Sequence, residues 1–268
     1  MKAMSELVYR EHSIAPDLWP FIKLIWSLEG SAPPGEPSWQ RIMPDGCVEL
    51  VFHFADRFET RYATGKCHRQ PWSFVVGQMD RFIEISPRGK IDFIAVRFHA
   101  RGAYRFFRCS LKAVAARVVD ARETWKHCTA DQIASASSLR GRLSIVEQSL
   151  RRALRCGRAH DRVVDAGLQL IESNAGELRV SELASEIGVS TRELTRRFEN
   201  AVGVSPKQHS RIIRFVSALH RLRERRHRTL TELALACGYF DQAHFNHDVR
   251  ELGGIAPHEI FVREDLDF

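Results

Sequence analysis

The sequence predicts an α+β protein of two domains, in which an N-terminal antiparallel β-barrel with trailing helices is followed by an all-α C-terminal domain. Three observations lead to this prediction. The chain has 268 residues, which is room for two domains. Its N-terminal part alternates apolar and polar residues over short stretches, as half-buried strands do. Its C-terminal part contains one helical pattern twice, which indicates a duplicated structural unit.

The expected strands are short and are separated by turn sequences. Residues 47–54 and 91–99 alternate most clearly, and shorter strands are expected around Trp26 and Leu28, at 74–77 and at 82–85. In the first stretch, the residues that share one face are Val48, Leu50, Phe52 and Phe54. Pro44-Asp45-Gly46 and Pro87-Arg88-Gly89 are turn tripeptides, because proline fixes φ and glycine accepts a positive φ. Several short strands with such turns predict an antiparallel sandwich or barrel.

The domain boundaries follow from changes in pattern and charge. We assign residues 1–108 to a β-rich sensor domain, 109–158 to a helical linker or dimerisation region, and 159–268 to the C-terminal domain. Within the linker, 111–125 and 130–154 are compatible with helices. One apolar stripe of the second helix consists of Leu139, Leu143, Val146 and Leu150. Two interpretations remain open: the stripe covers the sensor, or it pairs two protomers.

The first copy of the repeat reads as a helix-turn-helix unit. Gly188 supplies the turn between two helices, and Ser190 caps the second of them. Glu193, three residues later, is expected to complete a Ser-x-x-Glu capping box. The residues predicted to be buried are Leu183, Ile187, Leu194 and Phe198. The opposite face of the second helix is polar, as in a helix that contacts a ligand or solvent.

The second copy repeats this plan fifty residues later. Leu183-Ala184 and Gly188 return as Leu233-Ala234 and Gly238, and the sequence Gly-Val-Ser-Pro at 203–206 returns as Gly-Ile-Ala-Pro at 254–257. The caps expected here are Thr229 and Asp241, and the buried residues are Phe245 and Val249. Between the copies, residues 206–228 predict one long amphipathic helix. This helix would fix the separation of the two units.

The outward side chains of both units suit the major groove of DNA. Arginine can pair with guanine and glutamine with adenine, and a helix fits the groove. The residues predicted to read bases are Arg192, Thr195, Arg196, Gln242, His244 and His247. Those predicted to contact phosphates are Ser190, Arg197, Lys207, Arg211 and Arg214. The competing interpretation is a solvated face of an ordinary helical bundle. The duplication favours DNA, because two units on one rod would enter successive groove segments about 34 Å apart.

The distribution of charge along the chain supports this interpretation. The chain carries a formal net charge of +7, with an isoelectric point near 9.3. Residues 192–228 hold 11 basic and 3 acidic side chains, the footprint expected for a polyanion. Residues 101–158 hold 13 basic and 4 acidic side chains, which we interpret as a solvated helix face rather than a second DNA surface.

Residues 161–263 resemble the DNA-binding domain of AraC/XylS-type transcription regulators. The resemblance is carried by Leu-Ala-x-x-Cys-Gly-Tyr-x-Asp-Gln-Ala-His-Phe at 233–245 and by the Gly-Ile-Ala-Pro sequence after it. His247 and Val249 stand where the family usually has Arg and Phe, and Ala243 stands where Ser is common. The resemblance implies two helix-turn-helix units joined by a long helix. It also implies a cupin-like sensor, and residues 43–50 look like the N-terminal domain of a poorly characterised regulator subgroup.

For the sensor, we place four residues near an effector pocket: Trp26, Glu49, His53 and Arg97. The rival function is a cupin-type metal-dependent enzyme fused to a DNA-binding module. Such enzymes use closely spaced histidines, and His12, His53, His68 and His99 stand apart in the sequence. The six cysteines lack Cys-x-x-Cys spacing. We therefore expect no catalytic residue, no metal site and no cofactor.

Together these patterns predict a sequence-specific transcription regulator that is not an enzyme. The expected partners are double-stranded DNA with an asymmetric operator, a small-molecule effector and RNA polymerase, and a homodimer stays an open alternative. Residues 1–12 are charged and lack a long apolar run, so we expect a cytoplasmic protein that does not enter a membrane.

Overall fold

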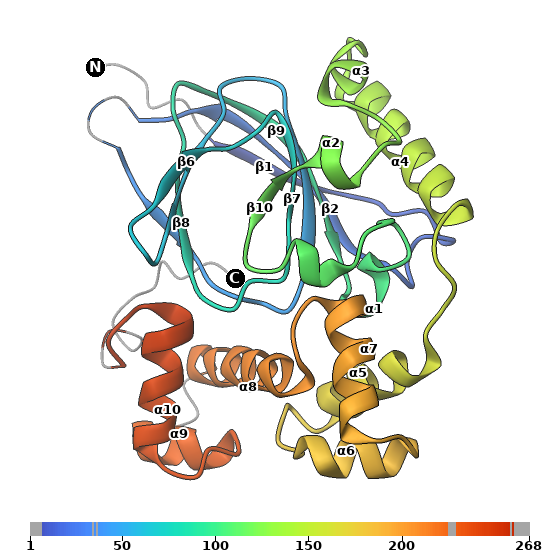
Figure 1. Ribbon diagram of the computed structural model, residues 1–268. Coiled ribbons are helices and arrows are strands. Elements are labelled where there is room, and N and C mark those ends of the chain that lie inside the picture. Colours follow the sequence, from blue (N-terminus) through green and yellow to red (C-terminus); the bar gives the residue numbers. More distant parts are fainter. Residues whose placement is uncertain (1–6, 34, 36, 225–228, 258, 260–268) are drawn as a thin grey trace.

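The computed structural model describes residues 7–33, 35, 37–224, 229–257 and 259. Figure 1 shows a β-rich domain above a domain made only of helices, as the sequence predicts. The end of the long helix expected at 206–228, with Arg225, Arg226 and Arg228, lies outside the described residues. In the part of the chain that the structure describes, no helix combines the length and the apolar character needed to cross a membrane.

The larger sheet has six antiparallel strands. Their order is β1-β2-β9-β4-β7-β10. The bounds are Val8–His12 for β1, Ile22–Ser31 for β2, Val48–His53 for β4, Ser73–Val76 for β7, Lys90–Phe98 for β9 and Val118–Asp120 for β10. The central pair joins β4 to β9, with Leu50 opposite Val96. The strongest alternating stretches of the sequence therefore form the centre of this sheet.

The smaller sheet has four antiparallel strands in the order β3-β8-β5-β6. Their bounds are Gln40–Ile42 for β3, Glu59–Tyr62 for β5, Cys67–Arg69 for β6 and Ile83–Ser86 for β8. In Figure 1 the two sheets curve around one interior. Both predicted turns form: Asp45 Oδ1 accepts the N–H of Cys47 at 3.0 Å, and Gly46 and Gly89 adopt φ values of 79° and 60°.

Each face of β4 enters a different apolar cluster, because successive side chains of a strand point to opposite sides. Leu50 and Phe52 join a core on the outer face that the trailing helices cover. Val51 joins a second cluster with Phe58 and Phe93 between the sheets. Glu49 and His53 share the parity of Val51, so they belong to the barrel interior.

The segment after β9 differs from the sequence prediction. Residues 111–125, expected as a helix, form a single 3₁₀ turn at Leu111–Ala113, then β10, then the short helix α2 at Ala121–Thr124. The edge of β7 explains this result, because it offers hydrogen bonds to a strand and Val118 and Val119 are β-branched. The short helix α1 spans Ala100–Ala103.

The stretch 130–154 forms two helices rather than one. Helix α3 spans Ala130–Ala134 and α4 spans Leu139–Arg155, and each has a hydroxyl cap of its own, from Thr129 and Ser138. Val146 and Leu150 of the predicted stripe are buried in the outer core of the sheet. Figure 1 shows α4 lying along the outside of the barrel. The stripe therefore packs within the chain.

The helical domain contains the predicted duplication. Its helices are α5 at Arg162–Ser173, α6 at Val180–Ile187, α7 at Thr191–Val202, α8 at Pro206–Arg223, α9 at Leu230–Ala236 and α10 at Gln242–Asp248, followed by a π-helical turn, η2, at Val249–Gly253. Helix α8 lies across the domain between the α6–α7 unit and the α9–α10 unit (Figure 1). Ile212, Phe215 and Leu219 of α8 are buried in the core of the second unit.

Candidate nucleic-acid interface

The first helix-turn-helix unit has the predicted turn and the predicted cap, but not the complete capping box, and Ile187 is only half-buried. Gly188 ends α6 in the left-handed conformation, with φ 77°, and Ser190 caps α7 by accepting the N–H of Glu193 at 3.1 Å. Leu194 and Phe198 are fully buried. The capping box is only half formed, because the Glu193 carboxylate turns to Arg197, 2.8 Å away, and not back to the cap. An arginine one turn later offers that carboxylate a charged partner.

The predicted base-reading residues of α7 lie on its outer side. Arg192 and Arg196 are exposed and contact no partner among the described residues. Thr195 donates its hydroxyl to the carbonyl of Thr191 at 2.8 Å, and its oxygen keeps acceptor capacity. The amino-terminal half of a recognition helix is the part that reaches base edges. Both arginines therefore have the position and the freedom that base reading requires.

The second unit places its predicted residues less uniformly. Asp241 caps α10 by accepting the N–H of His244 at 2.7 Å. Gln242 accepts the hydroxyl of Thr231 at 2.6 Å, so one of its groups is already engaged. The His244 ring packs edge-on against Tyr239, with centroids 5.2 Å apart. The side chain of His247 is 69% exposed, although its Nδ1 lies 3.7 Å from Asp248.

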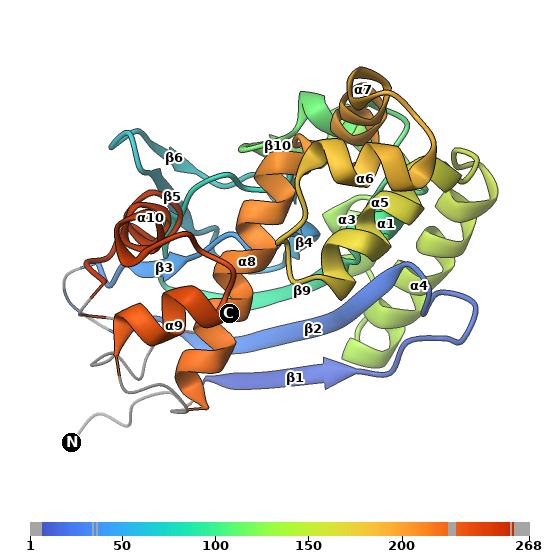
Figure 2. The same cartoon turned by 90° about the horizontal axis from the view of Figure 1, so that it is seen from below.

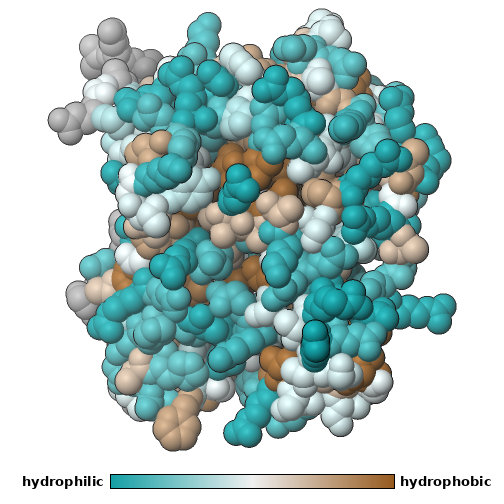
Figure 3. Space-filling view, viewed as in Figure 1, coloured by the Kyte–Doolittle hydropathy of each residue, from teal (hydrophilic) through white to brown (hydrophobic). Residues whose placement is uncertain are grey.

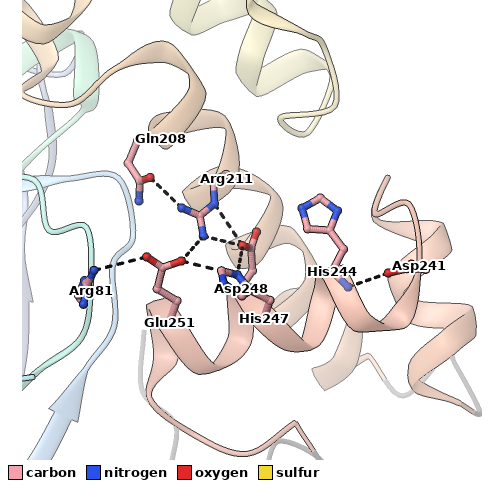
Figure 4. Close-up of polar contacts among 8 residues, drawn as sticks. All are labelled: Arg81, Gln208, Arg211, Asp241, His244, His247, Asp248 and Glu251. Carbon is pink, nitrogen blue, oxygen red and sulfur yellow. Dashed lines mark hydrogen bonds and ion pairs between the residues drawn. The ribbon is translucent and has the colours of Figure 1, made fainter.

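A cluster of charged groups joins α10 to α8 (Figure 4). Asp248 is 1% exposed and accepts from Arg211 at 2.6 Å, and Glu251 pairs with the same guanidinium at 2.6 Å. His247 lies 3.6 Å from Glu251. The ligand atoms of His247, Asp248 and Glu251 come within 4.8 Å of one another, as in a metal site. Arg211 already supplies the cation there, and it lowers the pKa of Glu251.

The residues predicted to contact phosphates therefore divide into two groups. Lys207 is exposed and has no partner among the described residues, and the Ser190 hydroxyl can still donate. Arg197 bridges Glu193 and Asp161, the latter at 3.3 Å. Arg211 is held by its two carboxylates, and Arg214 donates to the carbonyl of Gly176 at 3.0 Å. In this conformation these three arginines hold the domain together.

Three of the four predicted sensor residues meet inside the barrel. Trp26 Nε1 donates to Glu49 at 2.9 Å, and Arg97 Nε donates to the same oxygen at 3.3 Å. Asp45 lies 3.4 Å from Arg97 on its other side. Burial opposes the charge of Arg97, but these carboxylates outweigh it and raise the pKa of the guanidinium. The cluster links the centre of the larger sheet to the turn at Asp45.

His53 lies away from that cluster. It is 2% exposed, shares a hydrogen bond of 2.9 Å with Gln70 and stacks on Phe74. Burial lowers the pKa of His53, so the ring is neutral at pH 7. Its surroundings are those of a core histidine.

The contacts between the two domains were not predicted. Arg41 Nη1 donates to the carbonyl of Gly254 at 2.5 Å, and Arg81 lies 3.6 Å from Glu251. The Gln78 amide lies 3.0 Å from Nδ1 of His209 on α8. Nothing in the sequence pattern marks these residues, because their partners are more than a hundred positions away. They attach the barrel directly to α8 and to the end of α10.

Some basic residues of 101–158 are also explained by pairing. Arg142 contacts Asp92 at 2.8 Å, Arg151 contacts Asp17 at 2.9 Å, and Lys112 reaches Glu199 of α7 at 2.6 Å. These ion pairs join α4 to the barrel and the barrel to the first helix-turn-helix unit. Part of the positive charge of this segment is therefore used inside the molecule.

Comparisons with known proteins agree with this geometry. Residues 10–120 match a domain of unknown function (DUF6597), and residues 183–263 match a helix-turn-helix domain. The HTH-type transcriptional regulator ArgR of Pseudomonas aeruginosa is 30% identical over 106 residues, which are 39% of this chain and 32% of that protein. The HTH-type transcriptional activator RhaS of Salmonella schwarzengrund is 31% identical over 91 residues, 34% of this chain and 32% of that protein.

Among solved structures, a transcriptional regulator with an AraC-type DNA-binding domain from Chromobacterium violaceum is 28% identical. That match covers 37% of this chain and 89% of the other, with a TM-score of 0.34. The chain spans about a third of the length of the curated relatives that it matches. The matched part contains both helix-turn-helix units and the helix that joins them. The C-terminal domain of this chain is a helix-turn-helix domain of the AraC/XylS type, joined to an N-terminal domain of a family whose function is unknown.

Proposed function

We propose that the protein is a sequence-specific DNA-binding transcription regulator. The observation that carries the proposal is the placement of α7 and α10 at the two ends of α8. Both recognition helices begin at the side of the domain that faces away from the barrel, and Figure 2, seen from below, looks along them. The C-terminal ends of both helices face the barrel, where Glu199 meets Lys112 and Gly254 meets Arg41. Their N-terminal ends are therefore open to a ligand.

The separation of the two units is fixed by packing. Ile212 and Phe215 of α8 have no exposed surface and belong to the core of the second unit, and Ile213 packs against the core of the first. A buried, continuous helix resists bending, so both units move as one body. One chain then contacts two successive major-groove segments, which in other helix-turn-helix proteins requires a dimer.

The two units are expected to read different sequences. The first presents Arg192 and Arg196, which suit guanine, and the second presents Gln242, His244 and His247. The operator would therefore be asymmetric, with the stronger discrimination in the half contacted by α7. On the face drawn in Figure 3, most of the helical domain in the lower half is covered by hydrophilic side chains, with a few apolar ones among them, which suits a polar, charged partner.

Regulation is proposed to pass through the direct contact between the domains. The cluster of Trp26, Glu49 and Arg97 reaches the turn at Asp45 and Gly46, and Gly46 packs against His209 of α8. An effector that favours one arrangement of this cluster would shift the fraction of protein able to bind DNA. The proposed cytoplasmic regulator would act on RNA polymerase from its operator.

Selection of random duplexes by the full-length protein, followed by footprinting, tests the proposed function. The expected result is one asymmetric sequence with two protected segments about one helical turn apart. Duplexes retained without any common sequence would refute sequence-specific regulation.

A cupin-type enzyme remains the second candidate because the barrel interior contains charged side chains. Metal analysis of the purified full-length protein addresses it, and a stoichiometric transition metal would support the enzyme. We favour the regulator because the exposed outer faces of α7 and α10 suit DNA binding, and the contacts between the barrel and α8 suit its control. Neither feature serves catalysis.

A further inference from the structure

A groove of about 490 Å³ lies between the two helix-turn-helix units. Helix α8 forms its floor with Lys207, Ser210 and Arg214. Arg179, just before α6, lies on one wall, and His244 of α10 lies on the other. In Figure 4 the His244 ring projects from α10 beside the pair formed by Arg211 and Asp248. The groove therefore lies between the start of α6 in the first unit and the recognition helix α10 of the second.

A close backbone contact positions the first wall. Gly176 has φ 79°, and a Cβ at this position would lie 2.2 Å from the carbonyl oxygen of Ser210. Arg214 donates to the Gly176 carbonyl at 3.0 Å and so holds the same loop on α8. The start of α6 is thus fixed against the floor of the groove.

The floor contains a buried hydroxyl without a partner. Ser210 lines the groove and is 4% exposed, and its buried Oγ makes no hydrogen bond within the described residues. A buried polar group without a partner costs about 1–3 kcal/mol. A ligand oxygen in the groove would accept the hydroxyl proton and remove this cost. Ser210 therefore indicates a ligand that carries acceptor oxygens.

The charges around the groove favour an anion. Arg179 and Lys207 are exposed, and neither side chain contacts a partner among the described residues. The Glu182 carboxylate accepts the N–H of Arg179 at 2.8 Å, but no cap side chain accepts from the first amides of α6 itself, and such amides bind anions. Two acidic residues also line the groove, Glu177 and Asp248, and Arg211 neutralises the second. These two cations, Arg179 and Lys207, therefore outnumber the one carboxylate that is left, Glu177.

We propose that the groove binds a phosphate group of the DNA backbone, in the stretch between the two major-groove segments. This inference rests on the proposed function and adds Arg179, Ser210 and His244 to the DNA contacts. Arg179 and Lys207 supply charge, and Ser210 and the first amides of α6 supply hydrogen-bond donors. The first helix of a helix-turn-helix unit crosses the DNA backbone, as this placement requires. His244 then contacts phosphate instead of a base.

The first test compares the double variant Arg179→Ala/Lys207→Ala with Lys126→Ala/Arg140→Ala in the full-length protein. All four residues are exposed, and the control pair lies on the sensor side of the molecule, so the change in net charge is matched. Each lost phosphate contact should lower the slope of log affinity against log salt by about 0.9. We expect the groove variant to lose about 0.9 of slope, the value for one phosphate, and roughly tenfold in affinity on every duplex, with an unchanged sequence preference. Equal slopes in both variants would overturn the inference.

The second test locates the phosphate. Single methylphosphonate substitutions, which remove one backbone charge, are scanned across the operator. The wild-type protein should lose affinity when the substitution falls at one or two positions between the two protected segments. Arg179→Ala/Lys207→Ala should lose no further affinity at these positions, because the two side chains and the phosphate act as one interacting set. The same central losses in both proteins would contradict the assignment, as would a wild-type profile without central losses.

A free phosphate ligand is the competing source of the same chemistry. If inorganic phosphate raises the Tm of the wild-type protein but not of the groove variant, relative to sulfate at equal ionic strength, the groove serves a small anion and the assignment to DNA is wrong. Failure of the proposed function would give a different result, because the wild-type protein would then select no common sequence from random duplexes. That result would overturn this inference as well.

Discussion

Gln78 Nε2 lies 3.0 Å from Nδ1 of His209, and this contact joins the barrel to α8. Both side chains are buried, with 1% and 0% exposure. The same amide nitrogen donates to the carbonyl of Gly46 at 2.7 Å. One side chain therefore holds the sensor turn and the central helix of the DNA-binding domain together. His209 can accept this hydrogen bond only when Nδ1 is unprotonated.

We predict that acid weakens the folded protein through His209. Burial lowers the pKa of His209 to about 4, whereas an exposed histidine titrates near ~6.5. Between these values the unfolded chain binds more protons, so stability falls as the pH falls through this window and is constant above it. The loss attributable to His209 is about 3 kcal/mol at pH 4.

Calorimetric Tm values from pH 7.5 to 4.5 provide the measurement, with His209→Gln as the comparison. The variant should be less stable at pH 7 and less sensitive to acid. Some sensitivity should remain, because burial also lowers the pKa of His53. Parallel curves for the two proteins would show that His209 is not responsible.

Arg211→Ala should destabilise the helical domain. Its removal leaves Asp248, which is 1% exposed, without its ion-pair partner. Uncompensated buried charges are costly, and about 3 kcal/mol is expected. Lys207→Ala, on the same helix but exposed, should change stability by less than ~0.5 kcal/mol. Urea unfolding distinguishes them, and equal midpoints would mean that the Arg211 pair contributes little.

Gly176→Ala and Gly188→Ala form a matched pair, since their φ values are 79° and 77°. At Gly188 a Cβ would have no neighbour within 4 Å, so only the backbone conformation is penalised, by about 1 kcal/mol. At Gly176 the Cβ would meet a backbone oxygen at 2.2 Å, and the loop must move. We expect about 3 kcal/mol or more there. Similar losses of Tm in both variants would argue against a close approach of the loop to α8.

Arg196→Ala should relax sequence preference at one or two positions of the operator, at a cost of about 1–3 kcal/mol. Its guanidinium is exposed and unpaired among the described residues of α7. Quantitative binding to the selected operator, to its single-base variants and to random DNA measures the effect. Equal weakening on all of these duplexes would make Arg196 a phosphate contact.

The sequence by itself determined the local elements whose signals lie close together in the chain. Gly188 and Gly238 turn each unit, and Ser190 and Asp241 cap the recognition helices as predicted. The alternation in β4 and β9 likewise predicted two strands, although both faces of β4 are buried, in two different apolar clusters. These features could be predicted because turns, caps and periodicity depend on residues within a few positions of one another.

Competition between neighbouring elements explains what the sequence did not predict. Residues 111–125 are compatible with a helix, but residues 118–120 instead pair with β7 as an edge strand. Thr129 and Ser138 each start a helix, so 130–154 divided in two. A local sequence pattern indicates which secondary structures a segment is able to form. Neighbouring caps and strands decide which of them the segment adopts.

Only the tertiary structure decided which charged residues are available to DNA. Arg196 and Arg197 are adjacent and both were expected to contact DNA, yet Arg196 is exposed and unpaired among the described residues while Arg197 bridges Glu193 and Asp161. Arg211 is likewise paired with Asp248. Arg179 became a candidate DNA contact only because it lines the same groove as Lys207. The availability of a cation depends on carboxylates that folding brings from distant positions, and periodicity carries no information about them.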